Sequence, residues 1–77
     1  MPIDEAQWKQ RYAQLTERER DVILLVAKGK LNRQIALKLG ISERTVQVHR
    51  LGAYRKLDVH NVASLAPLTV LLERGVL

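Results

Sequence analysis

Apolar residues recur every three or four positions through most of this chain, which is the spacing of one face of an α-helix. The pattern predicts an all-α fold, with four core helices in residues 15–77 and a short N-terminal linker helix in residues 1–14. In the leading segment Trp8 and Tyr12 keep the helical spacing, and Pro2 suits a helix start. The sequence leaves open whether this segment caps the domain, stays disordered or contacts a partner.

The first core helix carries a signal at each end. Thr16 is followed three residues later by Glu19, the capping-box spacing in which two side chains satisfy backbone N–H groups at a helix start. Gly29 follows the apolar run and can take the left-handed conformation that ends a helix. We therefore expect one helix between these two signals.

Similar signals frame the next two helices. We expect Asn32 to cap a helix over residues 33–39, which Gly40 ends. We expect Ser42 to cap a longer helix from Glu43 to Leu57. The two helices are thus separated by only a tight turn.

The last helix is constrained by Pro67, which cannot lie in a helix interior. A cap at Ser64 would put this proline in the first turn, where its missing N–H does no harm. Residues 61–63 would then form a turn or a loose extra turn, and Gly75 would close the helix.

The second and third core helices have the spacing of a helix-turn-helix. Ala36 is small where the two helices must cross, Gly40 can adopt the positive φ of a sharp turn, and Val46 points back into the angle between them. Three further apolar residues fill the remaining inward positions: Ile35, Leu39 and Ile41. A helix presented in this way is how many proteins enter the major groove of DNA.

The charge distribution agrees with this interpretation. The chain has a net charge of +5, but residues 30–57 contain seven Lys or Arg and a single acidic residue. The flanking segments are close to neutral. A positive excess on the predicted helix pair is typical of a surface that binds phosphate.

One side of the 43–57 helix offers groups that can read bases. Gln47 can make paired hydrogen bonds to adenine, and Val48 and Leu51 can pack on a thymine methyl group. Arg44 can reach either a guanine edge or a phosphate. The candidate DNA backbone contacts are Lys30, Asn32, Arg33, Lys38, Thr45, Arg50, Tyr54, Arg55 and Lys56.

Gly52 is the least expected residue of the same helix. Glycine inside a helix costs about 1 kcal/mol relative to alanine. We expect either a close approach of the Gly52 backbone, to DNA or to a neighbouring helix, or a tolerated substitution.

Several functional classes are disfavoured by composition. The chain has no cysteine, no glycine-rich phosphate loop and no metal-ligand spacing, so neither an enzyme nor a cofactor or metal site is expected. A small-molecule substrate is not expected either. The polar start does not resemble a signal peptide, and no apolar run approaches the length of a membrane span. We therefore expect a cytoplasmic protein without membrane contact.

The segment LTERERDVILLVAKGKLNRQIALKLGISERTVQVHRLGAYRKLDV, from Leu15 to Val59, closely resembles the LuxR-type (GerE-like) helix-turn-helix domain. The lead-in RYAQLTERER resembles the junction before the effector domain of FixJ/NarL-type response regulators. The resemblance implies base contacts at Gln47, Val48 and Leu51. It also implies backbone contacts at Thr45, Arg50, Lys56 and the helix start around Asn32 and Arg33.

The resemblance also implies a dimer contact through the last helix. Apolar residues cover most of the circumference of this helix, more than one core-facing stripe requires. We therefore expect a weak homodimer on DNA that reads two half-sites, with contacts through Leu65, Leu68, Leu71 and Leu72. The alternative is that these leucines pack on Trp8 and Tyr12 within one monomer.

The leading hypothesis is that the chain is the sequence-specific DNA-binding effector domain of a bacterial transcriptional regulator, of the two-component response-regulator kind. Its expected partners are double-stranded DNA and RNA polymerase. One alternative is the promoter-binding region of a sigma factor, which shares the LTERER opening. Another is a protein-interaction module with the same fold, in which the basic face is incidental.

Overall fold

A computed structural model describes residues 3–77, and every regular element in that range is helical, which confirms the predicted all-α fold. Pro2, expected at a helix start, lies outside the described residues. The elements in chain order are α1 (Glu5–Ala13), α2 (Glu17–Ala27), α3 (Asn32–Leu39), α4 (Glu43–Leu57), the 3₁₀ helix η1 (Val62–Leu65) and α5 (Ala66–Glu73).

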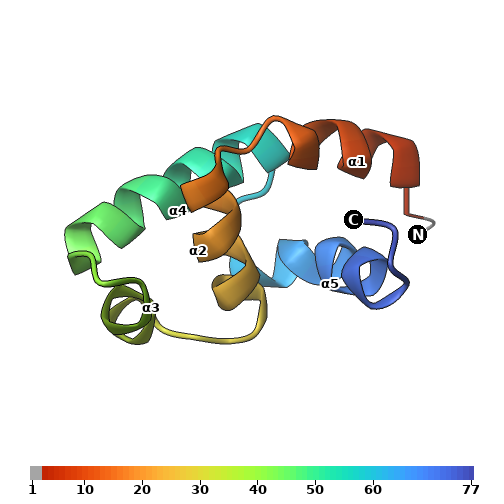
Figure 1. The fold of residues 1–77 in the computed structure, drawn as a ribbon. Helices are drawn as coiled ribbons and strands as arrows, with labels where there is room; N and C mark the ends of the chain where they lie inside the picture. The colour runs from red at the N-terminus through yellow and green to blue at the C-terminus, as the bar shows by residue number, and fades with distance from the viewer. Residues whose placement is uncertain (1–2) are drawn as a thin grey trace.

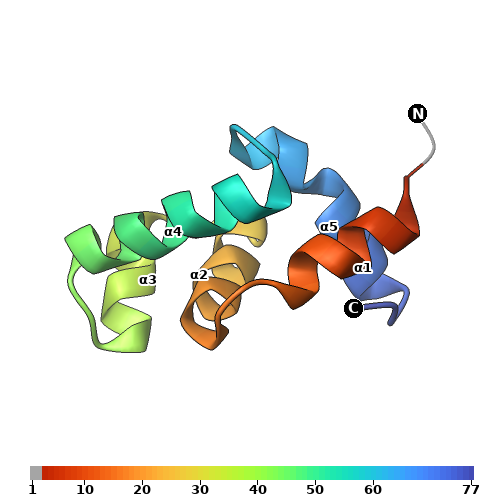
Figure 2. The same cartoon turned by 90° about the horizontal axis from the view of Figure 1, so that it is seen from above.

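The longest helix, α4, organises the molecule. It lies across α2 and α3 at one end of the domain, whereas α1 and α5 pack together at the other end, close to the C-terminus (Figures 1 and 2). The domain measures 35 × 20 × 19 Å. No helix in residues 3–77 has the length and apolar character needed to cross a membrane.

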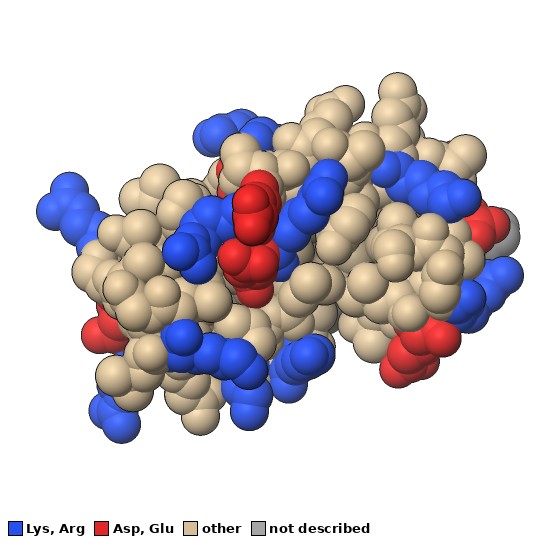
Figure 3. All heavy atoms as spheres, in the orientation of Figure 1, with Lys and Arg blue, Asp and Glu red and all other residues tan. Residues whose placement is uncertain are grey.

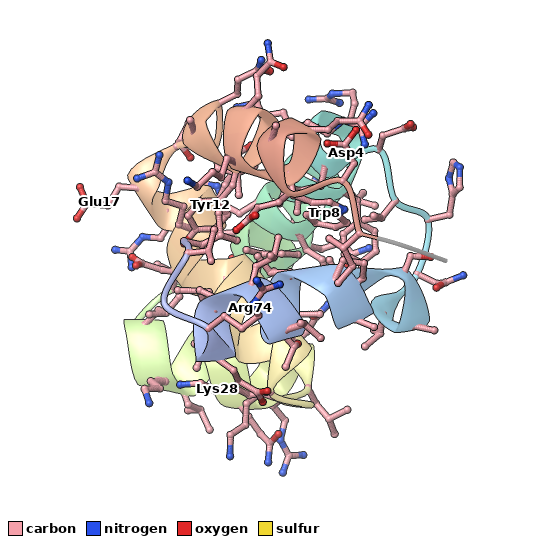
Figure 4. All side chains as sticks on the ribbon, turned by 90° about the vertical axis from the view of Figure 1, so that its right-hand side faces the viewer. Asp4, Trp8, Tyr12, Glu17, Lys28 and Arg74 are labelled. Carbon is pink, nitrogen blue, oxygen red and sulfur yellow. The ribbon has the colours of Figure 1, made fainter. Side chains whose placement is uncertain are left out.

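The helices share one apolar core. Its largest fully buried side chains come from α2, α3, α4, η1 and α5: Val22, Ile23, Val26, Ile35, Val46, Leu57, Leu65, Leu68 and Leu71. Trp8 of α1 lies between α1 and α5 (Figure 4) and is only 8% exposed. The helix predicted as a linker therefore packs on the domain.

Three of the four leucines predicted as dimer contacts belong to this core. Leu65, Leu68 and Leu71 are 1%, 0% and 0% exposed, and Leu72 is half-buried. Side chains enclosed in the monomer cannot contact a second copy, so the dimer contacts predicted at Leu65, Leu68 and Leu71 are corrected, whereas the one at Leu72 stays a prediction. Most of the apolar surface of the last helix is buried by packing in the monomer, where Trp8 belongs to the same cluster.

The capping-box prediction for α2 is confirmed. The Glu19 carboxylate accepts a hydrogen bond from the Thr16 N–H at 2.9 Å, and the Thr16 hydroxyl accepts one from the Glu19 N–H at 3.1 Å. These two bonds satisfy backbone donors that an uncapped helix start would leave without partners. The predicted Ser42 cap of α4 is also present, since its hydroxyl accepts from the Thr45 N–H at 3.0 Å.

Two predicted caps are corrected. Asn32 is the first residue of α3, preceded by Leu31 as the cap residue, whose N–H donates to the Gln34 side chain at 2.9 Å. Ser64 does not cap the last helix, because Asn61 caps η1 and accepts hydrogen bonds from both the N–H and the hydroxyl of Ser64.

The correction at Ser64 has a simple cause. A side-chain cap three residues earlier lets the chain make one 3₁₀ turn before α5, and Pro67 still lies in the first turn of α5 as predicted. The missing N–H of this proline therefore interrupts no helical hydrogen bond.

Candidate nucleic-acid interface

The turn between α3 and α4 has the predicted helix-turn-helix geometry. Gly40 ends α3 with φ of 69°, in the left-handed region that glycine enters without steric cost. Ala36 is buried at the crossing of the two helices, and Val46 is fully buried against them. The small residue, the turn glycine and the inward valine together fix which side of α4 faces solvent.

The outward side of α4 carries the predicted reading residues. Gln47 is exposed, and Val48 and Leu51 are 62% and 53% exposed. Arg44 and Arg55 are also exposed on α4. Apolar side chains left exposed beside a polar amide and two guanidinium groups form a surface suited to base edges and thymine methyl groups.

Basic side chains surround this surface. Figure 3 shows Lys and Arg side chains projecting from the end of the molecule formed by α3 and the beginning of α4. The predicted backbone contacts that the structure leaves exposed there are Lys30, Arg33 and Lys38. Together with Arg44 they give this end its positive charge, and Arg55 adds an exposed cation in the last turn of α4.

Asn32 links α3 to α4 through side-chain hydrogen bonds. Its Nδ2 donates to Oε1 of Gln47 at 2.8 Å, and its Oδ1 accepts from a terminal nitrogen of Arg50 at 2.9 Å. Arg50 also donates from Nε to the Tyr54 hydroxyl at 3.2 Å. Four predicted site residues therefore form one hydrogen-bonded chain, which we call the amide relay: Gln47, Asn32, Arg50 and Tyr54.

Three predicted DNA backbone contacts belong to the relay: Asn32, Arg50 and Tyr54. Tyr54 is only 9% exposed, and its hydroxyl accepts from Arg50 but keeps its own O–H donor, so the phosphate contact by Tyr54 stays a prediction. Thr45 was predicted to contact the DNA backbone through its hydroxyl and its N–H; because the N–H donates to the Ser42 hydroxyl, the hydroxyl is the group that remains for this contact. The Thr45 hydroxyl, in turn, accepts from the Ser42 hydroxyl at 2.8 Å.

Lys56 is held inside the domain by a carboxylate. Its Nζ lies 2.6 Å from Oε1 of Glu19, a residue that is 7% exposed. Burial raises the pKa of Glu19, but the hydrogen bond from Lys56 and those from Thr16 outweigh it, so the pKa lies below its ordinary value of 4.5. Because its charge is balanced by Glu19, Lys56 is a weaker candidate for phosphate contact than predicted.

The same carboxylate explains Gly52. A Cβ at this position would overlap Oε2 of Glu19 and lie 3.4 Å from its Cδ. The close approach expected at Gly52 is therefore made to the neighbouring helix α2. Glu19 at once caps α2, pairs with Lys56 and packs on the bare backbone of α4.

Sequence reasoning missed the amide relay and the Glu19–Lys56 pair. Both join residues from different helices, 15 to 37 positions apart, and helix spacing carries no information at that range. Gly52, in the middle of α4, was the one local signal that another helix comes close at the Glu19–Lys56 pair.

The chain is similar to known bacterial regulatory proteins in sequence and in structure. The family model described as "Bacterial regulatory proteins, luxR family" matches residues 13–69. A solved structure, the low-resolution structure of response regulator StyR, has 44% identity and a TM-score of 0.78, and the match covers 83% of this chain and 32% of that one.

Curated relatives agree with the family match. The response regulator protein TodT of Pseudomonas putida is 44% identical over 79% of this chain and 27% of its own length. The tetrathionate response regulatory protein TtrR of Salmonella typhimurium is 46% identical over 70% of this chain and 26% of its own length. The chain thus spans about a quarter of each of these two relatives. The chain belongs to the luxR family of bacterial regulatory proteins and has its helix-turn-helix DNA-binding domain.

Proposed function

We propose that this domain places α4 in the major groove of double-stranded DNA, as the sequence-specific effector domain of a bacterial transcriptional regulator of the response-regulator kind. It acts in the cytoplasm by occupying a promoter site, where it contacts RNA polymerase, and it performs no catalysis. The named relatives TodT and TtrR are response regulators, which supports this kind of regulator.

One observation carries the proposal: the exposed face of α4. Val48 is 62% exposed and Leu51 is 53% exposed, and the polar Gln47 lies beside them. The opposite side of α4 is buried in the core. Leaving such side chains in water is unfavourable by about 25 cal/mol per Å² of apolar surface. A thymine methyl group covers apolar surface in the groove, and Gln47 meets the base edge beside it.

The DNA backbone contacts follow from the same placement. Arg33 and Lys38 on α3, Arg44 and Arg55 on α4, and Lys30 before α3 are exposed cations around the reading face. The beginning of α3 lies beside Gln47, so it would approach the phosphates that border the groove. Each neutralised phosphate releases counterions, and binding therefore weakens as salt rises.

Two matched substitutions test the reading face. Val48→Glu and Val62→Glu each place one carboxylate at an exposed valine, the first on α4 and the second on η1. On DNA with a single site, Val48→Glu should abolish specific binding, whereas Val62→Glu should retain it. Target DNA would come from selection in a random pool, followed by titration of each variant. Equal loss in both variants would contradict the proposed orientation.

The dimer is proposed here with a different set of contacts. Ala66 and Val70 are exposed four residues apart on one side of α5, and Val62 is exposed on η1, which leads directly into α5. We call these three residues the apolar stripe of η1 and α5. Two copies meeting through this stripe about a two-fold axis would read two half-sites. The stripe is short, so we expect association to be weak without DNA.

The remaining alternatives differ in partner. The match to the luxR family model over residues 13–69 does not favour a sigma-factor region. A protein-interaction module would bind its partner with little dependence on salt and would not bind DNA, so the titration described above also distinguishes this class.

A further inference from the structure

The amide relay lies directly behind the reading face and ends on its central polar residue. It runs from the buried Tyr54 through Arg50 and Asn32 to Gln47, with bonds of 3.2, 2.9 and 2.8 Å. Tyr54 and Arg50 belong to α4, and Asn32 is the first residue of α3. The relay therefore joins the two helices of the helix-turn-helix at the point where Gln47 leaves the protein surface.

The chemistry of arginine fixes the direction of every bond in the relay. A guanidinium group donates hydrogen bonds and cannot accept them, so Asn32 must turn its Oδ1 toward Arg50. The NH₂ group of Asn32 then faces Gln47, so Gln47 accepts this hydrogen bond with its Oε1. The Nε2 amide group of Gln47 is consequently the end of the side chain that remains for a ligand.

The anchor of the relay is a buried side chain that contacts Arg50 in two ways. Tyr54 is 9% exposed, and the guanidinium carbon of Arg50 lies 5.4 Å from the centre of the Tyr54 ring, within range of a cation–π contact. Arg50 is thus held by the ring face as well as by the hydroxyl. A base-reading side chain supported in this way is oriented before DNA arrives, which reduces the entropy lost on binding.

We propose that Asn32 and Arg50 are positioning residues that hold the Gln47 amide with its NH₂ group toward the DNA, so that Gln47 selects a base presenting a hydrogen-bond acceptor. The proposal rests on the proposed function, since it assumes that α4 reads the major groove. In that groove guanine presents two acceptors, N7 and O6, adenine and thymine present one each, N7 and O4, and cytosine presents only the N4 donor. Gln47 therefore favours guanine, which offers the most acceptors, and rejects cytosine.

This preference differs from the adenine pairing expected from the sequence. Paired bonds to adenine require Oε1 of Gln47 to accept from the adenine amino group. In the structure Oε1 already accepts from Asn32, so the relay weakens that option and leaves the donor end of Gln47 free.

Asn32→Asp tests the relay because it reverses its polarity with little change of shape. One carboxylate oxygen would still accept from Arg50, but the other cannot donate to Gln47. Gln47 must then rotate its amide to donate Nε2–H inward, which presents Oε1 to the DNA. The variant should therefore prefer a base with a donor, cytosine or adenine.

The experiment measures base preference at the position read by Gln47. That position is the one at which Gln47→Ala loses selectivity in a selection from random DNA. Wild-type protein should bind guanine over cytosine there by about tenfold, and Asn32→Asp should lower this ratio by about a hundredfold, so that cytosine is bound about tenfold better than guanine. Gln34→Glu is the matched control: it adds the same charge nearby and keeps an acceptor for the Leu31 N–H. It should weaken binding uniformly and leave the ratio unchanged.

A second measurement needs no DNA. In nuclear magnetic resonance of the free protein, the Asn32 side-chain NH₂ should exchange with solvent more slowly than that of Gln47, and Asn32→Asp should slow the exchange of Gln47. Unchanged exchange at Gln47 would overturn the relay. If wild type and Asn32→Asp bind specifically but with the same ratio of guanine to cytosine, the role of the relay is overturned and the proposed function is not. A wild-type protein with no sequence preference would overturn the proposed function as well.

Discussion

At the scale of single residues, Glu19 connects three parts of the fold. Its carboxylate caps α2 through Thr16, pairs with Lys56 and occupies the space that a side chain at position 52 would need. A glycine that is unfavourable for the helix alone is therefore required by a neighbour from another helix.

Gly52→Ala should destabilise the domain although alanine is the better helix former. Overpacking costs about 1–3 kcal/mol, more than the gain in helix propensity of about 1 kcal/mol. In a Glu19→Ala background the obstructing carboxylate is absent, so the same substitution should be neutral or stabilising. Urea unfolding of the four proteins in this double-mutant cycle measures the sign. A stabilising Gly52→Ala in the wild-type background would contradict the contact.

The lowered pKa of Glu19 predicts a loss of stability in acid. A carboxyl whose pKa is lower folded than unfolded stabilises the fold above its ordinary pKa of 4.5, and that stabilisation disappears as pH falls through the lower folded value. Wild-type protein should therefore lose more free energy of unfolding than Glu19→Gln between about pH 6 and about pH 3. Glutamine is a suitable control because it can still accept from the Thr16 N–H. Parallel pH profiles of the two proteins would argue against this role.

At the scale of helices, the stability of each end depends on which residue caps it. The side-chain cap before the last helix is Asn61 rather than Ser64, and the 3₁₀ helix η1 that follows Asn61 leads directly into α5. The position of the cap therefore decides how the last helix enters the core, where Leu65 and Leu68 are buried.

Asn61→Ala should lower the free energy of unfolding by about 1 kcal/mol, the usual cost of losing a side-chain cap. Ser64→Ala should cost less, because the Ser64 hydroxyl donates only to Asn61 and its N–H would keep its partner. Thermal unfolding of both variants compares the two positions directly. A larger loss for Ser64→Ala would restore the cap predicted from the sequence.

At the scale of the whole molecule, the cations divide into those that face solvent and those that hold the fold together. Arg44 is exposed beside the reading face, whereas Lys56 balances Glu19. The net positive charge alone does not distinguish these two roles.

Arg44→Ala should reduce the dependence of DNA affinity on salt by about 0.9 in the slope of log affinity against log salt, the change for one lost phosphate contact. Lys56→Ala should leave that slope nearly unchanged and should instead lower the stability, since Glu19 would remain buried without its partner. Titrations at several salt concentrations, with unfolding measured alongside, separate the two. Equal slopes in the two variants would reinstate Lys56 as a phosphate contact.

The proposed dimer is also a property of the whole molecule. Val70→Glu, in the stripe of η1 and α5, should leave the free monomer folded and reduce cooperative binding to paired half-sites. Ala6→Glu, on the exposed side of α1, should not. Sedimentation across micromolar to millimolar protein, alone and with paired or single sites, measures the association. A strictly monomeric wild-type complex on paired sites would remove the dimer from the proposal.

The sequence by itself determined the helices and the orientation of α4. Helix spacing and caps act over three or four residues, so Thr16, Gly40 and Ser42 marked their helix ends correctly. The buried Val46 and exposed Val48 follow from the same period, because residues two apart lie on different sides of a helix.

Only the tertiary structure decided which polar side chains bond between helices and which apolar side chains are buried in the core. The pairing of Lys56 with Glu19 and of Asn32 with Gln47 depends on how α2, α3 and α4 cross. The burial of Leu71 likewise depends on where α5 packs. Helix crossing is set by the fit of whole side-chain surfaces, a long-range property that no local spacing specifies.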